Sequence, residues 1–440
     1  MRWIMAAVFG TMMLISVAAG HYYLWRRLLH DTGLSRRWKR GLTVLLFLLG
    51  AIFPLAFLLS RVAIELRPLF FLGFFWLGMV FYLVLLLGLW DGARALVRLK
   101  RFVGKRLSNR GVEEVSCSRD AEALERTGNK KLADKAAFQE EGENGNDSRK
   151  GEDKCLKNPD RRIFLARTAA ATSLAGAGAI GLIGLRYAKF HVETPEIPVK
   201  LARLPAELSG FKIAVLSDLH IGPTLRESFT RRVVDMTNGL KPDMTVLLGD
   251  IVDGPVSLIG GDVKPLGGLR APHGVFFVTG NHEYYSGAKE WVHFIKRIGI
   301  RVLMNERVSI GDKHPGGETF DLAGIGDRRA GMFVKSHAQN IGKAVRGRVD
   351  ERELVVLAHQ PSQISHVEKV NPGLQISGHT HGGQIWPWTY AVRLAEPYLC
   401  GLYRHNENTQ VFVTRGVGYW GPPIRFLAPA EIPCLVLQRA

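Results

Sequence analysis

Cysteine is scarce in this 440-residue sequence, and the cysteines present form no recognisable framework. The four cysteines, at positions 117, 155, 400 and 434, match neither a zinc-finger spacing nor the pattern of a disulfide-rich secreted domain. Their spacing therefore excludes a fold that depends on disulfides or on a cysteine-bound zinc ion. A Cys400–Cys434 bridge stays open, without support from the sequence.

The C-terminal part of the chain also lacks the dense positive charge of a nucleic-acid-binding protein. Residues 190–440 carry 28 Lys and Arg against 24 Asp and Glu, a net charge of +4. Residues 1–189 carry 30 against 16, a net charge of +14. The basicity of the chain thus belongs to its N-terminal part, which favours anionic lipid headgroups over nucleic acid as its partner.

Long apolar runs dominate that N-terminal part. Residues 3–25, 41–60 and 69–90 each have about the twenty apolar residues that cross a bilayer, so three transmembrane helices are expected. The loop between the first two runs contains six Lys and Arg, whereas the next loop contains only Arg61 and Arg67. This difference places the first loop in the cytoplasm.

Two further segments follow the third run. Basic residues from Arg94 to Arg110 are spaced like an amphipathic helix on the inner leaflet, so residues 1–110 should comprise three transmembrane helices and a basic juxtamembrane segment. Residues 111–160 are polar, mixed in charge and nearly free of large apolar side chains. A flexible cytoplasmic linker is predicted there.

A fourth apolar run, at residues 169–185, follows the pair Arg161 and Arg162. Segment 161–189 resembles a twin-arginine export signal, in which paired arginines precede a mildly hydrophobic stretch of small residues. Alternatively, the two arginines anchor an ordinary transmembrane helix, and the sequence favours neither reading. Both predict a fourth crossing and an extracytoplasmic location for residues 190–440.

Residues 190–440 are predicted to form one α/β domain, because short apolar runs alternate with segments of helical periodicity. The predicted strands are residues 211–216, 244–248, 275–279, 354–358 and 374–377, and the predicted helices are residues 226–240, 288–298 and 335–345.

Each predicted strand is followed by side chains that can bind a metal ion. In order along the chain these are Asp218 and His220, then Asp250, then Asn281 with its neighbour His282, then His359, and finally His379 and His381. Each has an ordinary explanation alone, such as a turn aspartate or a buried structural histidine. In α/β sheets, ligand pockets lie at the carboxyl ends of the strands. A single pocket in which these side chains meet therefore explains their presence at all five strand ends better than coincidence does.

Carboxylate oxygens and imidazole nitrogens without thiolate suit Mn²⁺, Fe or Zn²⁺. The candidate ligands are too many for one ion. Two divalent metal ions about 4 Å apart, sharing a carboxylate and a hydroxide, would use them all and would favour an in-line displacement at phosphorus.

The blocks D-x-H, G-D-x-x-D, G-N-H-E, H and G-H-x-H, in this order over residues 211–384, resemble the calcineurin-like metallophosphoesterase superfamily. Residues 414–432 also resemble its bacterial membrane-associated branch of YkuE-type and YaeI-type phosphodiesterases. The resemblance implies a metallophosphoesterase domain over residues 190–440, folded as a four-layer α/β/β/α sandwich behind a multi-pass α-helical membrane region.

Position by position, the resemblance also implies roles for the candidate residues. One ion would be held by Asp218, His220 and His381. The second would be held by Asn281, His359 and His379, with Asp250 as the bridge. His282 would be the catalytic acid or would stabilise negative charge on the leaving group, and Asp253 and Glu283 would support the ligands through hydrogen bonds.

The leading hypothesis is therefore a membrane-tethered, dinuclear phosphoesterase of a bacterial inner membrane, and more specifically a phosphodiesterase. Its expected substrate is an extracytoplasmic phosphoester of lipid or envelope origin. A UDP-2,3-diacylglucosamine-type pyrophosphatase of lipid A synthesis is an alternative, but its substrate is made in the cytoplasm. A non-catalytic envelope-binding or scaffold protein is a third reading, against which the complete ligand set argues. Arg415 and Arg425 are candidates to meet an anionic substrate, although surface salt bridges explain them more simply.

Overall fold

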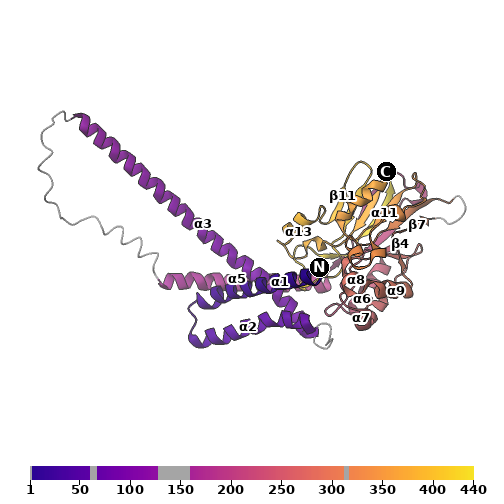
Figure 1. The fold of residues 1–440 in the computed structure, drawn as a ribbon, viewed down its shortest axis with the longest axis horizontal. Coiled ribbons are helices and arrows are strands. Elements are labelled where there is room, and N and C mark those ends of the chain that lie inside the picture. Colours follow the sequence, from indigo (N-terminus) through magenta and orange to yellow (C-terminus); the bar gives the residue numbers. More distant parts are fainter. Residues whose placement is uncertain (1, 60–66, 127–158, 312–316) are drawn as a thin grey trace. The chain divides into compact units, whose positions relative to one another are not determined.

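A computed structural model describes residues 2–59, 67–126, 159–311 and 317–440 of the chain (Figure 1). The chain divides into two units. The first comprises residues 1–47 and 80–178, and the second comprises residues 48–79 and 179–440. Each unit is described by itself.

The N-terminal part is mainly helical. Its elements are α1 (Arg2–Leu24), the π-helix η1 (Trp25–His30), α2 (Arg36–Leu59), α3 (Arg67–Arg126) and α5 (Pro159–Phe190). Because α3 continues to Arg126, the first part of the predicted linker, residues 111–126, is helical. Low hydrophobicity argues against a packed core but not against a solvated helix rich in Glu, Arg and Ala, which are good helix formers. Residues 127–158 lie outside the described residues.

Three helical stretches among the described residues are long and apolar enough to cross a membrane: Arg36–Leu55, Pro68–Gly104 and Pro159–Phe190. They correspond to the second, third and fourth predicted crossings. The first predicted crossing forms α1, which is not among the three, and the side chains of its residues up to 9 lie outside the described part. Four crossings therefore stay a prediction.

Among the described residues of the α/β part, the strands form two six-stranded sheets and a small two-stranded one. The first sheet contains, in spatial order, β2 (Glu196–Leu201), β14 (Cys434–Arg439), β3 (Lys212–Leu216), β4 (Met244–Leu247), β5 (Val275–Phe277) and β6 (Arg301–Val302). The second contains β11 (Gly401–Arg404), β12 (Gln410–Val413), β10 (Leu374–Ser377), β9 (Leu354–Leu357), β8 (Thr319–Gly324) and β7 (Glu306–Gly311). The small sheet pairs β1 (Val192–Glu193) with β13 (Ala430–Glu431).

Short helices connect the strands. They are α6 (Glu227–Gly239), α7 (Val256–Val263), α8 (Asn281–Ser286), α9 (Ala288–Arg297), α10 (Ala330–Phe333), α11 (Ile341–Ala344), α12 (Ile364–Val367) and α13 (Thr389–Ala395). The 3₁₀ turns are η3 (Ala206–Leu208), η4 (Lys264–Gly268), η5 (Lys335–His337), η6 (Pro361–Gln363), η7 (Glu368–Val370) and η8 (His381–Gly383). The helix predicted over residues 335–345 is thus divided into η5 and α11.

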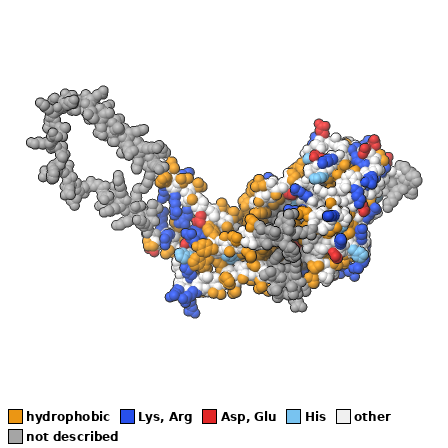
Figure 2. All heavy atoms as spheres, in the orientation of Figure 1, with side chains coloured by type: hydrophobic (Ala, Val, Ile, Leu, Met, Phe, Trp, Pro, Cys, Tyr) orange, Lys and Arg blue, Asp and Glu red, His pale blue; other side chains and the backbone are white. Residues whose placement is uncertain are grey.

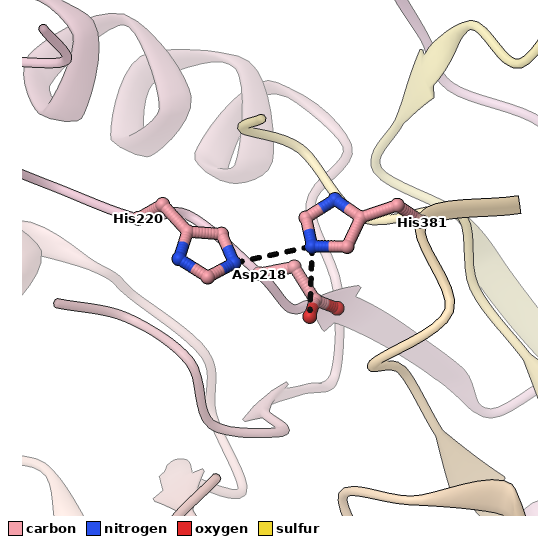
Figure 3. Close-up of side chains that lie close together, drawn as sticks. All are labelled: Asp218, His220 and His381. Carbon is pink, nitrogen blue, oxygen red and sulfur yellow. Dashed lines mark hydrogen bonds and ion pairs between the residues drawn. The ribbon is translucent and has the colours of Figure 1, made fainter. Parts of the chain in front are cut away.

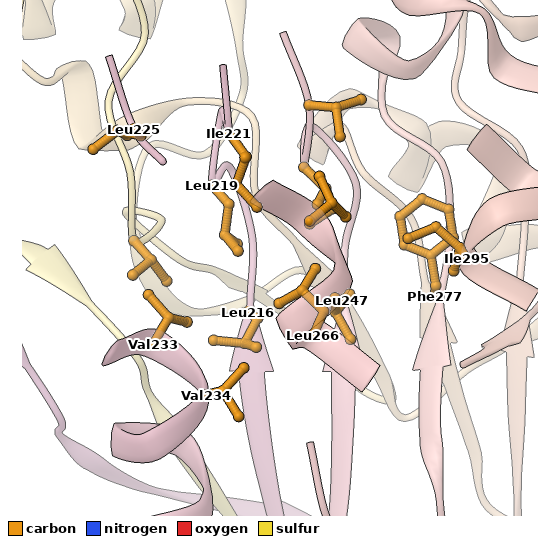
Figure 4. Close-up of a cluster of buried hydrophobic side chains, with 14 of the residues drawn as sticks. Leu216, Leu219, Ile221, Leu225, Val233, Val234, Leu247, Leu266, Phe277 and Ile295 are labelled. Atoms are coloured by element: carbon orange, nitrogen blue, oxygen red, sulfur yellow. The ribbon is translucent and has the colours of Figure 1, made fainter. Parts of the chain in front are cut away.

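Strands β3, β4 and β5 are buried on both faces. Leu216, Leu247 and Phe277, one from each strand, pack with Val233 of α6 and Ile295 of α9 (Figure 4). Their chain neighbours Val215, Val246 and Phe276 belong to a second cluster, which includes Phe320, Val355 and Ile376 of the other sheet. Alternation of side chains along a strand sends neighbours to opposite faces, so these strands read as continuous apolar runs.

Parallel pairing positions the loops that carry function. β3 pairs in parallel with β4, and β4 with β5, so their carboxyl ends share one edge of the first sheet. β9 and β10 are likewise parallel in the second sheet. Cys400 and Cys434 are free thiols, so the bridge that the sequence left open is not formed.

Candidate metal centre

The residues of the candidate metal centre lie in the loops that follow β3, β4, β5, β9 and β10. Five of them have a positive φ: Asp218 (54°), His220 (48°), Asp250 (52°), His379 (71°) and His381 (53°). Few residues other than glycine adopt this conformation, and it concentrates at functional sites, where the surrounding structure enforces it. Three of the five loops, those after β3, β4 and β10, therefore turn sharply at positions where the sequence predicts ligands.

Asp218, His220 and His381 form a first group of potential ligand atoms (Figure 3). The Nε2 atoms of His220 and His381 lie 3.1 Å apart, and His381 Nε2 is 3.6 Å from Asp218 Oδ1. Asp218 and His220 are buried. Three ligand atoms thus converge from two loops of the first and second sheets.

Asp250, His359 and His379 form a second group. His359 Nε2 lies 3.1 Å from Asp250 Oδ2 and 3.2 Å from His379 Nδ1. The Nδ1–H of His359 donates to the carbonyl oxygen of Leu248 at 2.7 Å. A hydrogen bond of this kind directs Nε2 of a histidine towards the ion that it binds.

Asn281, the remaining predicted ligand, is buried at the start of α8. Its Oδ1 has no hydrogen-bond partner among the described residues. The next residue, His282, donates its backbone N–H to Asp250 Oδ1 at 2.8 Å, so Asn281 adjoins the second group. An unpaired buried carbonyl oxygen costs roughly 1–3 kcal/mol, and a cation would satisfy it. Carboxylate, imidazole and amide donors together fit hard or borderline divalent ions.

Burial and charge together tune the titrating groups of the centre. Burial lowers the pKa of His379 to about 3, and it also lowers the pKa of His381, so both rings are neutral at pH 7, as metal binding requires. Burial would also lower the pKa of His359, but the carboxylates of Asp250, Asp218 and Asp327 together outweigh this effect and raise the pKa to about 10. The buried carboxylates thus stabilise positive charge in the pocket. Either a proton on histidine or a bound cation can supply that charge.

Asp253 lies between two histidines. Its carboxylate is 3.1 Å from His220 Nδ1 and 2.5 Å from His282 Nδ1, and the three side chains form a third group of potential ligand atoms. Burial would lower the pKa of His282, but the charges of Asp250 and Asp253 outweigh it and raise the pKa to about 9. His282 is therefore a cation at neutral pH, and 14% of its side chain remains exposed.

Comparison with known proteins agrees with this geometry. A family model described as calcineurin-like phosphoesterase matches residues 211–383. The chain is also 30% identical to the uncharacterized metallophosphoesterase YkuE of Bacillus subtilis, over 64% of this chain and 99% of that protein. The chain belongs to the calcineurin-like metallophosphoesterase family.

Other metallophosphoesterases share more identity over less of their length. A transmembrane protein with metallophosphoesterase domain from Danio rerio is 36% identical over 59% of this chain and 61% of its own length. An uncharacterized metallophosphoesterase of Helicobacter pylori (strain ATCC 700392 / 26695) is 40% identical over 55% of this chain and 63% of its own length. The chain thus spans about three fifths of these two relatives.

Glu283 connects two loops of the metallophosphoesterase domain. Its buried carboxylate accepts the backbone N–H groups of Gly280 (2.6 Å), Ile251 (2.8 Å) and Asp250 (3.0 Å). Burial, followed by the nearby Asp250 carboxylate, raises the pKa of Glu283 to about 7. Glu283 and Asp253 therefore hold ligands in place through hydrogen bonds, the kind of contact that the resemblance implies for them.

Protein groups engage the guanidinium groups of both arginines singled out in the sequence. Arg415 makes ion pairs with Glu193 at 2.7 Å and with Glu431 at 2.5 Å. Arg425 is only 1% exposed, and its guanidinium donates to the carbonyl oxygens of Gly418, Ala428 and Arg415. It also lies 3.4 Å from His381 Nδ1. Arg425 is a positioning residue behind His381, a role for which the sequence shows no signal.

Two aromatic rings beside His282 were also missed by the sequence analysis. The rings of Tyr285 and Trp420 lie 5.2 Å and 5.6 Å from the imidazole, both edge to face. A single aromatic residue carries no functional signature in sequence, because only its neighbours in space give it a role.

Gly280 offers a test of the centre, because a Cβ at this position would lie 2.2 Å from Asp250 Oδ1. We expect Gly280→Ala to displace the Asp250 carboxylate and to weaken metal binding about 10- to 100-fold, as loss of supporting contacts typically does. The measurement is metal content of the purified full chain by mass spectrometry after equilibration with Mn²⁺ or Zn²⁺. Gly261→Ala is the matched control, because its Cβ would meet nothing within 4 Å. Equal metal content in the two variants would contradict the assignment.

Proposed function

We propose that the chain is a membrane-tethered, dinuclear, metal-dependent phosphoesterase, and specifically a phosphodiesterase. The observation that carries this proposal is the pair of adjacent ligand groups, one around Asp218 and one around Asp250. The two groups meet where the backbone N–H of His379 donates to the Asp218 carboxylate at 3.0 Å. The two sheets with their flanking helices also support a four-layer sandwich, the arrangement that the family resemblance implies.

In this proposal the two divalent metal ions are Mn, Fe or Zn. One would be held by Asp218, His220 and His381, and the other by Asn281, His359 and His379. Asp250 would contribute to both, as the family resemblance implies, and its carboxylate contacts His359 and the backbone N–H of His282. When bound, the ions would supply Lewis-acid polarisation of the phosphoryl group and would lower the pKa of the attacking water.

His282 is the proton donor of the proposed reaction. Asp253 binds its Nδ1, so the ring keeps a fixed orientation and a positive charge. Nε2 carries the other proton of the imidazolium and can deliver it to the oxygen of the departing alcohol. The rings of Tyr285 and Trp420 pack edge to face against the imidazole and support this orientation.

Two substitutions separate metal binding from proton donation. His282→Ala should lower kcat for an aryl phosphodiester about 10²- to 10⁴-fold at unchanged metal content, because it removes only the acid. Asp250→Ala should lose both activity and bound metal. Activity is assayed with Mn²⁺ on the purified full chain, with His293→Ala, an exposed histidine of α9, as the control. Turnover that persists in both site variants would refute the proposed chemistry.

An exposed apolar surface supports a lipid or envelope-derived substrate. We call it the aromatic surface; it consists of Trp386, Trp388, Tyr390, Leu394, Trp420 and Leu427. Leu394 is 92% exposed and Leu427 is 72% exposed, and α13 buries none of its residues. Large apolar patches mark interaction sites, and Trp and Tyr are enriched where proteins meet the membrane interface. Trp420 joins this surface to His282.

The aromatic surface continues into two of the apolar helices within the same unit. The backbone N–H of Arg425 donates to the carbonyl oxygen of Gly184 in α5 at 2.9 Å. Ile424 packs so closely on Gly78 of α3 and on Gly184 that no Cβ would fit at either glycine without a shift. Residues 420–427 therefore lie between the metal centre and helices that are apolar enough to cross a membrane.

Removal of apolar side chains from this surface should affect amphiphilic substrates selectively. We expect Trp388→Ser combined with Leu394→Ser to lower kcat/KM for a phosphodiester lipid in micelles at least about tenfold, since two exposed side chains no longer enter the lipid phase. Turnover of a water-soluble aryl phosphodiester should stay unchanged. Val349→Ser, at another exposed apolar residue, is the control. Equal loss on both substrates would argue against a lipid-facing role.

The proposal places the domain outside the cytoplasm of a bacterium, following four crossings and the charge pattern of the loops. The transmembrane relative from Danio rerio supports a membrane protein in general. A UDP-2,3-diacylglucosamine-type pyrophosphatase would share the amphiphilic substrate but would need a cytoplasmic metal centre. A non-catalytic scaffold is disfavoured by the complete ligand set.

Orientation can be tested without knowledge of the substrate. Protease added to intact spheroplasts that express the chain with a C-terminal tag should digest residues 190–440, as followed by immunoblot. Protection until the spheroplasts are lysed would place the domain inside and would favour the pyrophosphatase reading. A cytoplasmic protein serves as the control for intact membranes.

A further inference from the structure

A second polar site lies in the other unit, far along the chain from the metal ligands. A cavity of about 330 Å³ opens between the end of α1 with η1 and the part of α3 that follows its apolar run. Four arginines line it: Arg26, Arg27, Arg94 and Arg98. This arginine cavity has no part in the proposed phosphoesterase reaction.

The two carboxylates in the arginine cavity are already engaged. Arg27 makes ion pairs with Asp31 at 2.9 Å and with Asp91 at 2.7 Å, and Tyr23 donates a hydrogen bond to Asp91 at 2.7 Å. The other three arginines have no hydrogen bond or ion pair among the described residues. Four arginines against two aspartates leave a net charge of +2 in the lining. Like charges held at one cavity repel one another, so an anion there is stabilising.

The helices α3 and η1 direct the arginine side chains into the same cavity. Asp91, Arg94 and Arg98 follow one another at spacings of three and four residues, and therefore share a face of α3. Arg26 and Arg27 belong to η1, a π-helix, and helical irregularities of this type concentrate at functional sites. The Nε of Arg27 is buried without a hydrogen-bond partner among the described residues.

Neighbouring helices hold η1 in position. Trp25 Nε1 donates to Thr43 Oγ1 of α2 at 3.0 Å, and Arg167 Nε of α5 donates to the carbonyl oxygen of Thr32 at 2.9 Å. Leu24 and Leu29 are buried. The arginine cavity is therefore built by several helices and does not depend on one flexible side chain.

The chemistry of this lining selects a phosphate group. Guanidinium groups match phosphate oxygens in charge and in planar, two-point geometry, and a cavity of this size is within the range of small-ligand sites. The cavity lies where the apolar run of α3 gives way to charged residues, the depth at which headgroups meet a protein. Figure 2 shows Lys and Arg side chains gathered beside hydrophobic ones on the helical part.

We infer that the arginine cavity binds the phosphate group of an anionic molecule, either the headgroup of a membrane lipid or a free phosphate ester. The test uses the full chain purified in a neutral detergent and native mass spectrometry. It is titrated with phosphatidylglycerol, with phosphatidylcholine of the same acyl chains, and with water-soluble glycerol 1-phosphate. One phosphatidylglycerol should bind per chain, at least about tenfold more tightly than phosphatidylcholine.

Variants locate the binding site. Arg94→Gln combined with Arg98→Gln should weaken phosphatidylglycerol binding about tenfold or more. Arg36→Gln combined with Arg37→Gln removes the same charge from exposed positions of α2 outside the cavity, and it should have little effect. Folding of the double variant is checked by circular dichroism and gel filtration. If it fails to fold, Arg26→Gln, on the opposite wall of the cavity, is the second variant to test.

The outcomes distinguish the two sources of phosphate. Binding of phosphatidylglycerol alone identifies a lipid headgroup, and equally tight binding of glycerol 1-phosphate identifies a free phosphate ester. Failure of both to bind, or equal weakening in the cavity variants and in the α2 control, would overturn the inference. None of these results depends on phosphoesterase activity, so they stand or fall separately from the proposed function.

Discussion

Asp250 is held from both sides, and the arrangement of the metal centre depends on this. Its carboxylate contacts His359 Nε2 and the backbone N–H of His282, whereas its own backbone N–H donates to Glu283. Glu283 also accepts the backbone N–H of Gly280, so one carboxylate connects the loops after β4 and β5. The absence of a side chain at Gly280 leaves room for the Asp250 carboxylate. Parallel pairing of β3, β4 and β5 delivers these loops to one edge.

The strands, and the candidate ligands that gather at their ends, could be predicted because their signals are local. All five predicted strands are present as β3, β4, β5, β9 and β10, each buried on both faces and each followed by a polar loop. Pairing between distant segments was not predictable. β14 pairs with β2 and β3, which lie more than two hundred residues earlier. Its apolar run, Cys434–Leu437, is as long as that of β9, so a strand is compatible with its sequence, but its partners in the sheet are not evident from it. The prediction also did not include β7, β8, β11 and β12.

The residues of the site likewise divide into those with a local sequence signal and those whose role depends on distant segments. Asp218, His220, His379 and His381 could be predicted from motif spacing, because each pair is two residues apart at a strand end. Arg425 could not, because its role follows from burial against loop carbonyls that only the folded chain assembles. Trp420 likewise acquires a role only through its proximity to His282. The arginines of the N-terminal part were predicted as headgroup contacts, but the sequence does not show that four of them enclose a cavity.

Close packing of Ile424 against Gly78 and Gly184 has a consequence for the helices themselves. Ile424 lies directly against the backbones of both helices at these glycines. A larger side chain at either position would therefore displace the loop that contains Ile424. The next residue in that loop is Arg425. Its guanidinium donates to the carbonyl oxygen of Gly418 and contacts His381 Nδ1. The apolar segments therefore support the loop behind His381, and a truncated chain that begins after residue 190 would leave Ile424 exposed to water.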